Sequence, residues 1–175
     1  EKKADNVKVT GEVRASYRDV DTDAAGHDGH EGLLRSRLWV NGQINEDWSY
    51  TGMFENNQDF GNETGDDEID FARAYVEGRV GGLGVVAGRY NEAPFSGNIL
   101  DANLDMAKVS YGDKVKVSAL AGKAYDTADN VFDGNGNKYT LQDDDRIYIG
   151  SIEAALGDVD AYVAYFKTDS SLENH

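Results

Sequence analysis

Arginine recurs at alternating positions of segments that have the pattern of β-strands. These residues are Arg14, Arg35, Arg37, Arg73 and Arg89, and the carboxylate Glu55 follows the same alternation. A guanidinium keeps its charge at physiological pH, and its planar group makes several hydrogen bonds in fixed directions. On the wall of a water-filled space, such fixed charges would sort ions and orient dipolar solutes. The alternative is that they form only solvated ion pairs across neighbouring strands.

Other candidate chemistry is weaker. His27, His30 and Glu31 could bind a metal, but they stand in a glycine-rich loop, without the rigid spacing that metal ligands need. A calcium loop starting at residue 133 would need Gly where Lys138 stands and Glu where Asp144 stands. We expect no metal site and no cofactor, and weak divalent-ion binding by residues 143–145 stays open. The sequence contains no serine nucleophile elbow, phosphate-binding glycine loop or zinc helix, so we expect no enzyme activity.

The elements that would position the arginines are long strands. Apolar and polar residues alternate with a period of two, which indicates two-faced strands. The segments with this pattern are residues 7–17, 32–44, 48–56, 69–80, 83–90, 105–111, 115–122, 146–156 and 159–167. We expect Arg89 to lie on the same face as the other arginines, which would place Tyr90 on the opposite face.

The connectors between these segments alternate between long acidic loops and short turns. Long connectors span residues 19–31, 57–68, 91–104 and 125–145, and short ones span 45–47, 81–82, 112–114 and 157–158. In an up-and-down sheet every second connection lies at the same end, as in outer-membrane barrels. Strands of about ten residues match a tilted bilayer crossing. The pattern predicts an all-β fold, an antiparallel up-and-down transmembrane β-barrel, with a soluble β-sandwich as the alternative.

Composition agrees with this fold and excludes some functions. The 175 residues suffice for one domain, and 33 acidic against 17 basic side chains give a formal net charge of −16. This charge argues against nucleic acid as a partner. Cysteine is absent, so there is no disulfide framework. No apolar run reaches the roughly 20 residues of a transmembrane helix, but barrel strands cross with only modest mean hydropathy.

The order of several short segments resembles bacterial outer-membrane porins. The resemblance is strongest to the major porins of diderm Firmicutes, which carry an N-terminal S-layer homology domain. The segments are Val-Lys-Val-Thr-Gly-Glu-Val-Arg from Val7, Arg-Ser-Arg-Leu-Trp-Val-Asn-Gly from Arg35, Asn-Glu-Asp-Trp from Asn45, Arg-Ala-Tyr-Val-Glu-Gly from Arg73, Gly-Arg-Tyr-Asn from Gly88 and Ala-Lys-Val-Ser-Tyr-Gly from Ala107. Together they cover nearly the whole chain.

The resemblance implies a trimeric barrel of about 16 strands, whereas about nine are predicted here. We therefore expect residues 7–175 to be an incomplete porin-like barrel domain and residues 1–6 to be the tail of a linker. In porins the third long loop folds into the lumen and narrows it. The residues that would form this constriction are Glu92, Pro94, Phe95, Gly97, Asp101 and, at the loop exit, Asp105.

The resemblance also implies a function. It predicts passive diffusion of small hydrophilic solutes and ions through a homotrimer in the bacterial cell outer membrane. Membrane lipid and lipopolysaccharide would surround the barrel, and an S-layer homology domain that this sequence lacks would link it to the cell wall. Two alternatives remain open: a structural protein that tethers the membrane to the cell wall, and a soluble acidic β-rich adhesin or carbohydrate-binding module.

Overall fold

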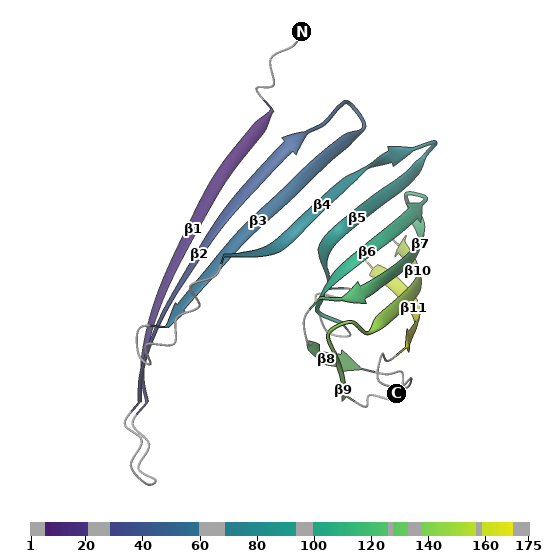
Figure 1. Cartoon of the computed structure of the whole chain (residues 1–175). Helices are drawn as coiled ribbons and strands as arrows, with labels where there is room; N and C mark the ends of the chain where they lie inside the picture. The colour runs from purple at the N-terminus through teal and green to yellow at the C-terminus, as the bar shows by residue number, and fades with distance from the viewer. Residues whose placement is uncertain are drawn as a thin grey trace. The chain divides into compact units, whose positions relative to one another are not determined.

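The computed structural model describes residues 6–20, 29–59, 69–93, 100–125, 128–132, 138–156 and 159–169. Within these ranges every regular element is a β-strand (Figure 1). The strands are β1 (Val7–Val20), β2 (Gly29–Gln43), β3 (Trp48–Asp59), β4 (Asp70–Val80), β5 (Leu83–Glu92), β6 (Ala102–Tyr111), β7 (Val115–Ala124), β8 (Ala128–Phe132), β9 (Lys138–Leu141), β10 (Arg146–Leu156) and β11 (Val159–Asp169).

One antiparallel meander contains nearly all of these strands. It is a nine-stranded sheet of order β1-β2-β3-β4-β5-β6-β7-β10-β11, so the predicted all-β, up-and-down topology is confirmed. The predicted alternation of long and short connectors is confirmed as well. β1 and β11 are the two edges of the sheet, and the predicted closure into a barrel is not present among the described strands.

The sequence pattern missed one hairpin. Residues 125–145 read as a single long loop, but β8 and β9 pair there as a separate two-stranded antiparallel sheet. The third long connector is also shorter than predicted. Asn91 and Glu92 still belong to β5, and β6 already begins at Ala102.

The chain divides into two compact units. Unit 1 comprises Glu1–Gly42 and Thr51–Ala72, and unit 2 comprises Gln43–Tyr50 and Arg73–His175. In unit 1 the register of β1 on β2 pairs Val9 with Val40, and it pairs Glu12 with Arg37. Directly paired residues point to the same side of a sheet. Unit 1 therefore has an apolar face and a charged face.

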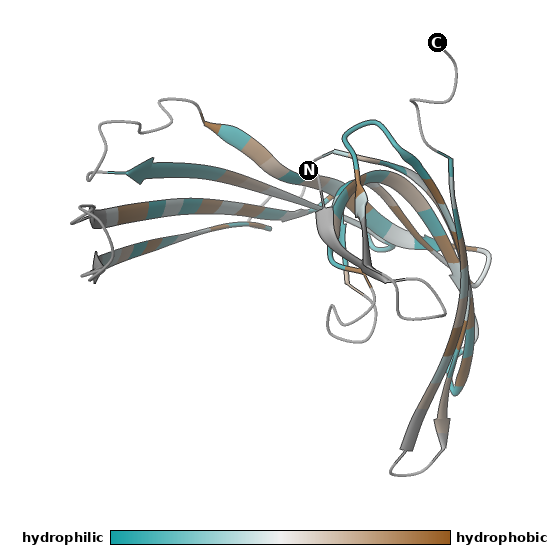
Figure 2. Ribbon diagram, turned by 90° about the horizontal axis from the view of Figure 1, so that it is seen from below, coloured by the Kyte–Doolittle hydropathy of each residue, from teal (hydrophilic) through white to brown (hydrophobic). Residues whose placement is uncertain are grey.

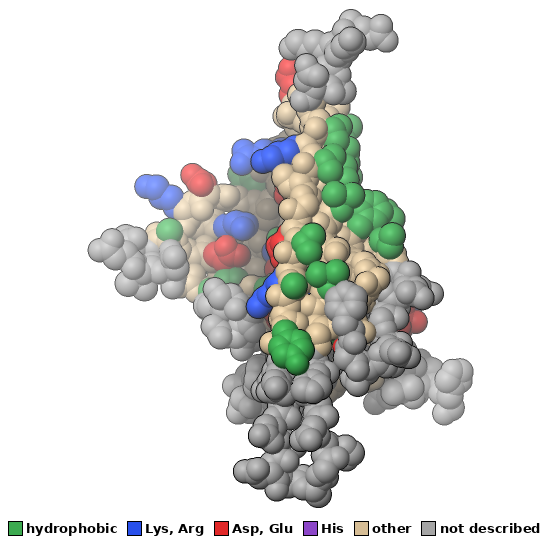
Figure 3. All heavy atoms as spheres, turned by 90° about the vertical axis from the view of Figure 1, so that its left-hand side faces the viewer, with side chains coloured by type: hydrophobic (Ala, Val, Ile, Leu, Met, Phe, Trp, Pro, Cys, Tyr) green, Lys and Arg blue, Asp and Glu red, His purple; other side chains and the backbone are tan. Residues whose placement is uncertain are grey.

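The two faces of unit 1 are visible along its edge. Figure 3 looks onto the β1 side, where hydrophobic side chains gather to one side of the strand and basic and acidic side chains to the other. The apolar face is largely exposed, and the exposed residues on it include Val7, Val9, Val13, Tyr17 and Leu38. Unit 1 thus has no extensive apolar core among its described residues.

Unit 2 contains a small core on one face of its sheet. Leu104 of β6, Leu120 of β7 and Ile147 of β10 are buried there, and Leu141 of β9 and Leu100 pack onto them. We call this the concave face of unit 2, because β5 and β6 curl over it. Tyr90, Lys108, Lys116, Glu153 and Tyr162 lie on the same face by register or contact.

The other face of unit 2, the convex face, carries an exposed apolar surface. Register aligns Val85, Val109 and Ala119 across three strands, and it aligns Val117, Ile152 and Val163 across the next three. Figure 2 shows the resulting alternation of hydrophilic and hydrophobic bands along the strands. The strands are therefore two-faced throughout, as the period of two predicted.

Candidate functional site on the charged and concave faces

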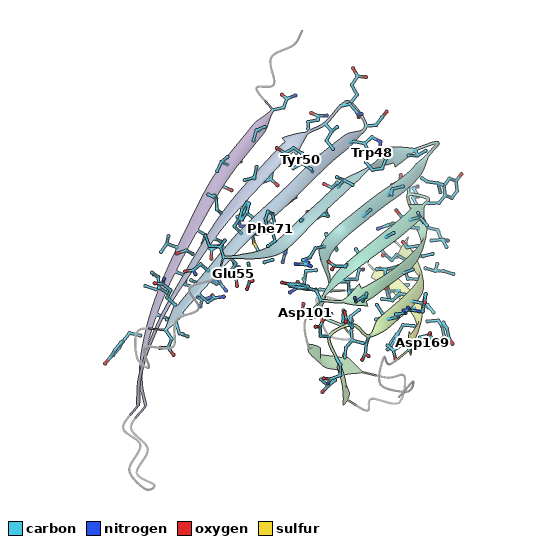
Figure 4. All side chains as sticks on the ribbon, viewed as in Figure 1. Trp48, Tyr50, Glu55, Phe71, Asp101 and Asp169 are labelled. Carbon is cyan, nitrogen blue, oxygen red and sulfur yellow. The ribbon has the colours of Figure 1, made fainter. Side chains whose placement is uncertain are left out.

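The charged face of unit 1 holds most of the arginines that the sequence singled out. Arg37 of β2 forms an ion pair with Glu55 of β3, and Arg35 donates to the carboxylate of Glu12 at 3.1 Å. Figure 4 shows Glu55 on its strand. The exposed pair adds little stability, since such pairs contribute about 0–1 kcal/mol.

Two of these arginines stand directly opposite one another. Arg14 of β1 pairs in register with Arg35 of β2. Like charges directly opposite one another destabilise a sheet. The Arg14–Arg35 pairing therefore does not contribute to the stability of the sheet. Both residues line a cavity of about 420 Å³, whose other lining residues are Ser16, Leu33, Leu34, Asn57 and Gln58. The Nε atom of Arg35 is buried and has no hydrogen-bond partner. This face thus presents excess positive charge to a hollow.

The concave face of unit 2 holds a second hollow, of about 510 Å³. Its lining residues are Tyr90, Glu92, Ala93, Asp113, Lys114, Lys116, Glu153, Ala154, Ala155, Ala161 and Tyr162. Lys108 donates to Glu92 at 2.7 Å, and both side chains are largely buried. Lys116 and Glu153, which are paired in register, approach to 3.5 Å.

The ion pair between Glu92 and Lys108 shows that the sheet curls. In the ladder Glu92 pairs with Ala102, and Lys108 pairs with Val86. On a flat sheet the two charged residues would be six positions apart along the strands, about 20 Å. Their contact at 2.7 Å therefore requires β5 and β6 to curl over the concave face. Gly88 has a φ of +122° in the middle of this region, a backbone conformation that favours glycine.

The prediction for Arg89 is wrong. The two-residue turn at 81–82 leaves Val80 opposite Leu83, and the register that follows pairs Arg89 with Ala74 and with Asp105. Arg89 and Asp105 therefore lie on the convex face, whereas Tyr90 lies on the concave face with Leu104. Arg89 and Asp105 make two hydrogen bonds, of 2.8 and 3.0 Å. The guanidinium also stacks over the ring of Tyr125 at 3.2 Å.

The remaining predicted residues are scattered. Arg73 precedes Ala74 in β4, so it points to the concave side. Asp101 is exposed and accepts a hydrogen bond of 2.9 Å from Asn91; Figure 4 shows it at the long-connector end of its strands. Pro94, Phe95 and Gly97 lie outside the described residues, as do His27 and residues 133–137. The described part of the chain contains no group of three acidic, His or Cys side chains that could hold a metal ion.

Sequence reasoning missed the residues that build the hollow of unit 2. The sequence places Lys108, Lys116 and Glu153 at polar positions of alternating strands. It contains no signal that Glu92 lies close to them in the folded chain. That contact depends on the curl, which brings together residues distant along the strands. The indole of Trp48 packs against Gly78 near the short turns.

Comparisons with known proteins add no family to this picture. No model of a protein family matches the sequence, and no curated protein matches it either. The described ranges contain no helix that is long and apolar enough to cross a membrane.

Proposed function

We propose that this sheet is part of the wall of a transmembrane β-barrel that forms a water-filled channel in the bacterial outer membrane. The channel admits small hydrophilic solutes and ions by passive diffusion. In each unit we assign the face that carries buried or paired charges to the water-filled side, namely the charged face of unit 1 and the concave face of unit 2, and the apolar face to lipid. The resemblance to porins described above agrees with this function.

One observation carries the proposal: the convex face of unit 2 exposes large apolar side chains, whereas polar side chains are buried on the concave face beside the small apolar core. On its convex face Val163 is 70% exposed and Tyr165 is 75% exposed. On its concave face, the hydroxyl residues Ser118 and Ser151 are only 5% and 7% exposed. Soluble proteins rarely leave so many large apolar side chains together on the surface. In a bilayer such a face is favourable, because lipid removes it from water.

The described residues that flank the third long connector lie on the concave face of unit 2. Ala93, which follows β5, lines the hollow of unit 2, and Leu100, which precedes β6, is buried in the core on the concave face. Both ends of the connector therefore lie against the face that we assign to the lumen.

Conductance tests the channel directly. The protein, folded in detergent, is added to a planar lipid bilayer bathed in potassium chloride. We expect stepwise, ohmic increases in current, because a water-filled pore conducts in proportion to voltage. A correctly folded protein that inserts and leaves the bilayer silent would contradict the channel. A protein that folds fully without detergent or lipid would support the soluble β-module instead.

Ion selectivity tests which face lines the lumen. Replacing Arg35 and Arg37 with Ser removes positive charge from the charged face, so selectivity should shift toward cations. Arg89→Ser is the matched control, because Arg89 lies on the convex face. The measurement is the reversal potential in a salt gradient. An equal shift in both variants, or a shift only in the control, would refute the assignment of the faces.

A further inference from the structure

The hollow on the concave face of unit 2 has the properties of a ligand site. Its volume, about 510 Å³, falls within the range of about 300–1,000 Å³ that is typical of small-molecule pockets. It lies within one unit and combines two half-buried tyrosines, Tyr90 and Tyr162, with charged groups from β5, β7 and β10. A sheet face that only contacts water would not need aromatic side chains that are partly enclosed in this way.

Glu92 supplies an unused acceptor at this site. Its side chain is 9% exposed, and one carboxylate oxygen, Oε1, accepts a hydrogen bond from Lys108. The other oxygen, Oε2, is buried without a hydrogen-bond partner. Buried carboxylate oxygens nearly always have a donor, so the free oxygen marks a place for one from a ligand.

The charge balance of the hollow indicates a neutral ligand. Lys108 already neutralises Glu92, and Lys116 and Glu153 neutralise one another at 3.5 Å. Asp113 and Lys114 add one charge of each sign at the short turn. A cation would find no uncompensated acid here, whereas a hydroxyl can donate to Oε2 without any change in charge.

We propose that this hollow binds a small, neutral, polyhydroxylated solute of the saccharide class. A hydroxyl of the solute donates to Oε2 of Glu92. Lys116 and Glu153, whose own contact is long, offer a donor and an acceptor to further hydroxyls. The rings of Tyr90 and Tyr162 cover the apolar C–H surface of the sugar, in the way that amphipathic tyrosine serves many binding sites. The inference rests on the proposed function, because it names the class of solute that the channel would select.

Sucrose is the probe, and single-channel current is the first readout. We expect sucrose to lower the current saturably, beyond the linear fall that it causes in bulk conductivity. Glu92→Gln should raise the half-blocking concentration about tenfold, because a hydrogen bond to a charged group is lost. Tyr162→Ala should weaken the block as well, and it tests the site even where Glu92→Gln does not fold.

Asp105→Asn is the control. It makes the same change from carboxylate to amide in an ion-paired residue, but on the convex face, so the sucrose block should stay as in the unchanged protein. Normal conductance without a saturable sucrose effect would overturn the inference and leave the channel intact. The absence of conductance would overturn the channel, and calorimetric titration of the folded protein with sucrose would then decide the inference separately.

Discussion

At the scale of residues, the ion pairs of this protein differ most in their burial. The pair between Arg35 and Glu12 is open to water, and half of the Glu12 side chain is exposed. The pair between Lys108 and Glu92 is largely enclosed by the curl of the sheet. Water screens the first pair strongly and the second one weakly. Loss of one partner should therefore have very different consequences in the two cases.

Lys108→Met should destabilise the protein by about 3 kcal/mol, because it leaves the buried carboxylate of Glu92 without its cation. Glu12→Gln should change the free energy of unfolding by less than about 1 kcal/mol, since its pair is exposed. Urea-induced unfolding from detergent micelles measures both variants. Equal effects would mean that Glu92 finds another partner or that the curl opens readily.

Arg89 shows what the sequence could have predicted at this scale. The short turn at 81–82 allows a register to be counted outward from Val80 and Leu83, and this count pairs Arg89 with Ala74. Since Arg73 and Ala74 are neighbours in one strand and point to opposite faces, the face of Arg89 followed from the sequence. The contact of Glu92 with Lys108 did not, because a count of positions contains no information on how sharply a sheet curls.

At the scale of elements, β5 depends on a glycine at its bend. Gly88 has a φ of +122°. A Cβ added there would collide with the carbonyl oxygen of Ala74 and would lie 2.8 Å from the Cα of Tyr75. Both neighbours are backbone atoms of β4, which cannot yield without a shift of the ladder. Gly150 of β10 is the natural comparison, because an added Cβ there meets nothing within 4 Å.

Gly88→Ala should lower the free energy of unfolding by about 1–3 kcal/mol, through backbone strain and collision with β4. Gly150→Ala should be neutral or slightly stabilising, since alanine restricts the unfolded chain. Thermal unfolding followed by circular dichroism measures both. If Gly88→Ala proved as stable as Gly150→Ala, the bend at residue 88 would not be a fixed feature of the sheet.

The long strands were predictable, and the β8–β9 hairpin was not. Long alternating segments such as β1 and β10 carry their own signal, because a period of two persists over many residues. β8 and β9 span only Ala128–Phe132 and Lys138–Leu141, too short for such a pattern. Leu141 is nevertheless buried in the core of unit 2. Tertiary packing, which no local pattern reports, explains this element.

At the scale of the whole molecule, the same polarity appears in both units. Each has a face with exposed apolar residues, and the opposite face carries ion pairs, although unit 2 also has the Arg89–Asp105 pair on its convex face. On the concave face of unit 2, buried polar residues, Ser118, Ser151 and Glu92, lie beside the small apolar core. Mean hydropathy therefore says little about where this chain resides.

Val117→Arg tests the environment of the convex face. In water this exposed position should tolerate arginine, whereas near the middle of a bilayer arginine costs about 2–4 kcal/mol. We therefore expect a marked loss of stability for the protein in lipid vesicles. Glu46→Arg, in an exposed short turn, is the control and should change stability little. A convex face that accepts arginine in vesicles without loss would contradict contact with lipid.

The meander also sets the order in which the chain can fold. Within the sheet each strand pairs with the next one along the chain, except that β10 follows β7 in the ladder. Successive strands can therefore pair one after another, each closing only a short connector. The pairing of β7 with β10 closes the longest connector, residues 125–145. Closure entropy grows with loop length, and the β8–β9 hairpin shortens the flexible chain that must be ordered. We therefore expect the hairpin to assist the β7–β10 pairing, so that its deletion delays the docking of β10 and β11 during refolding.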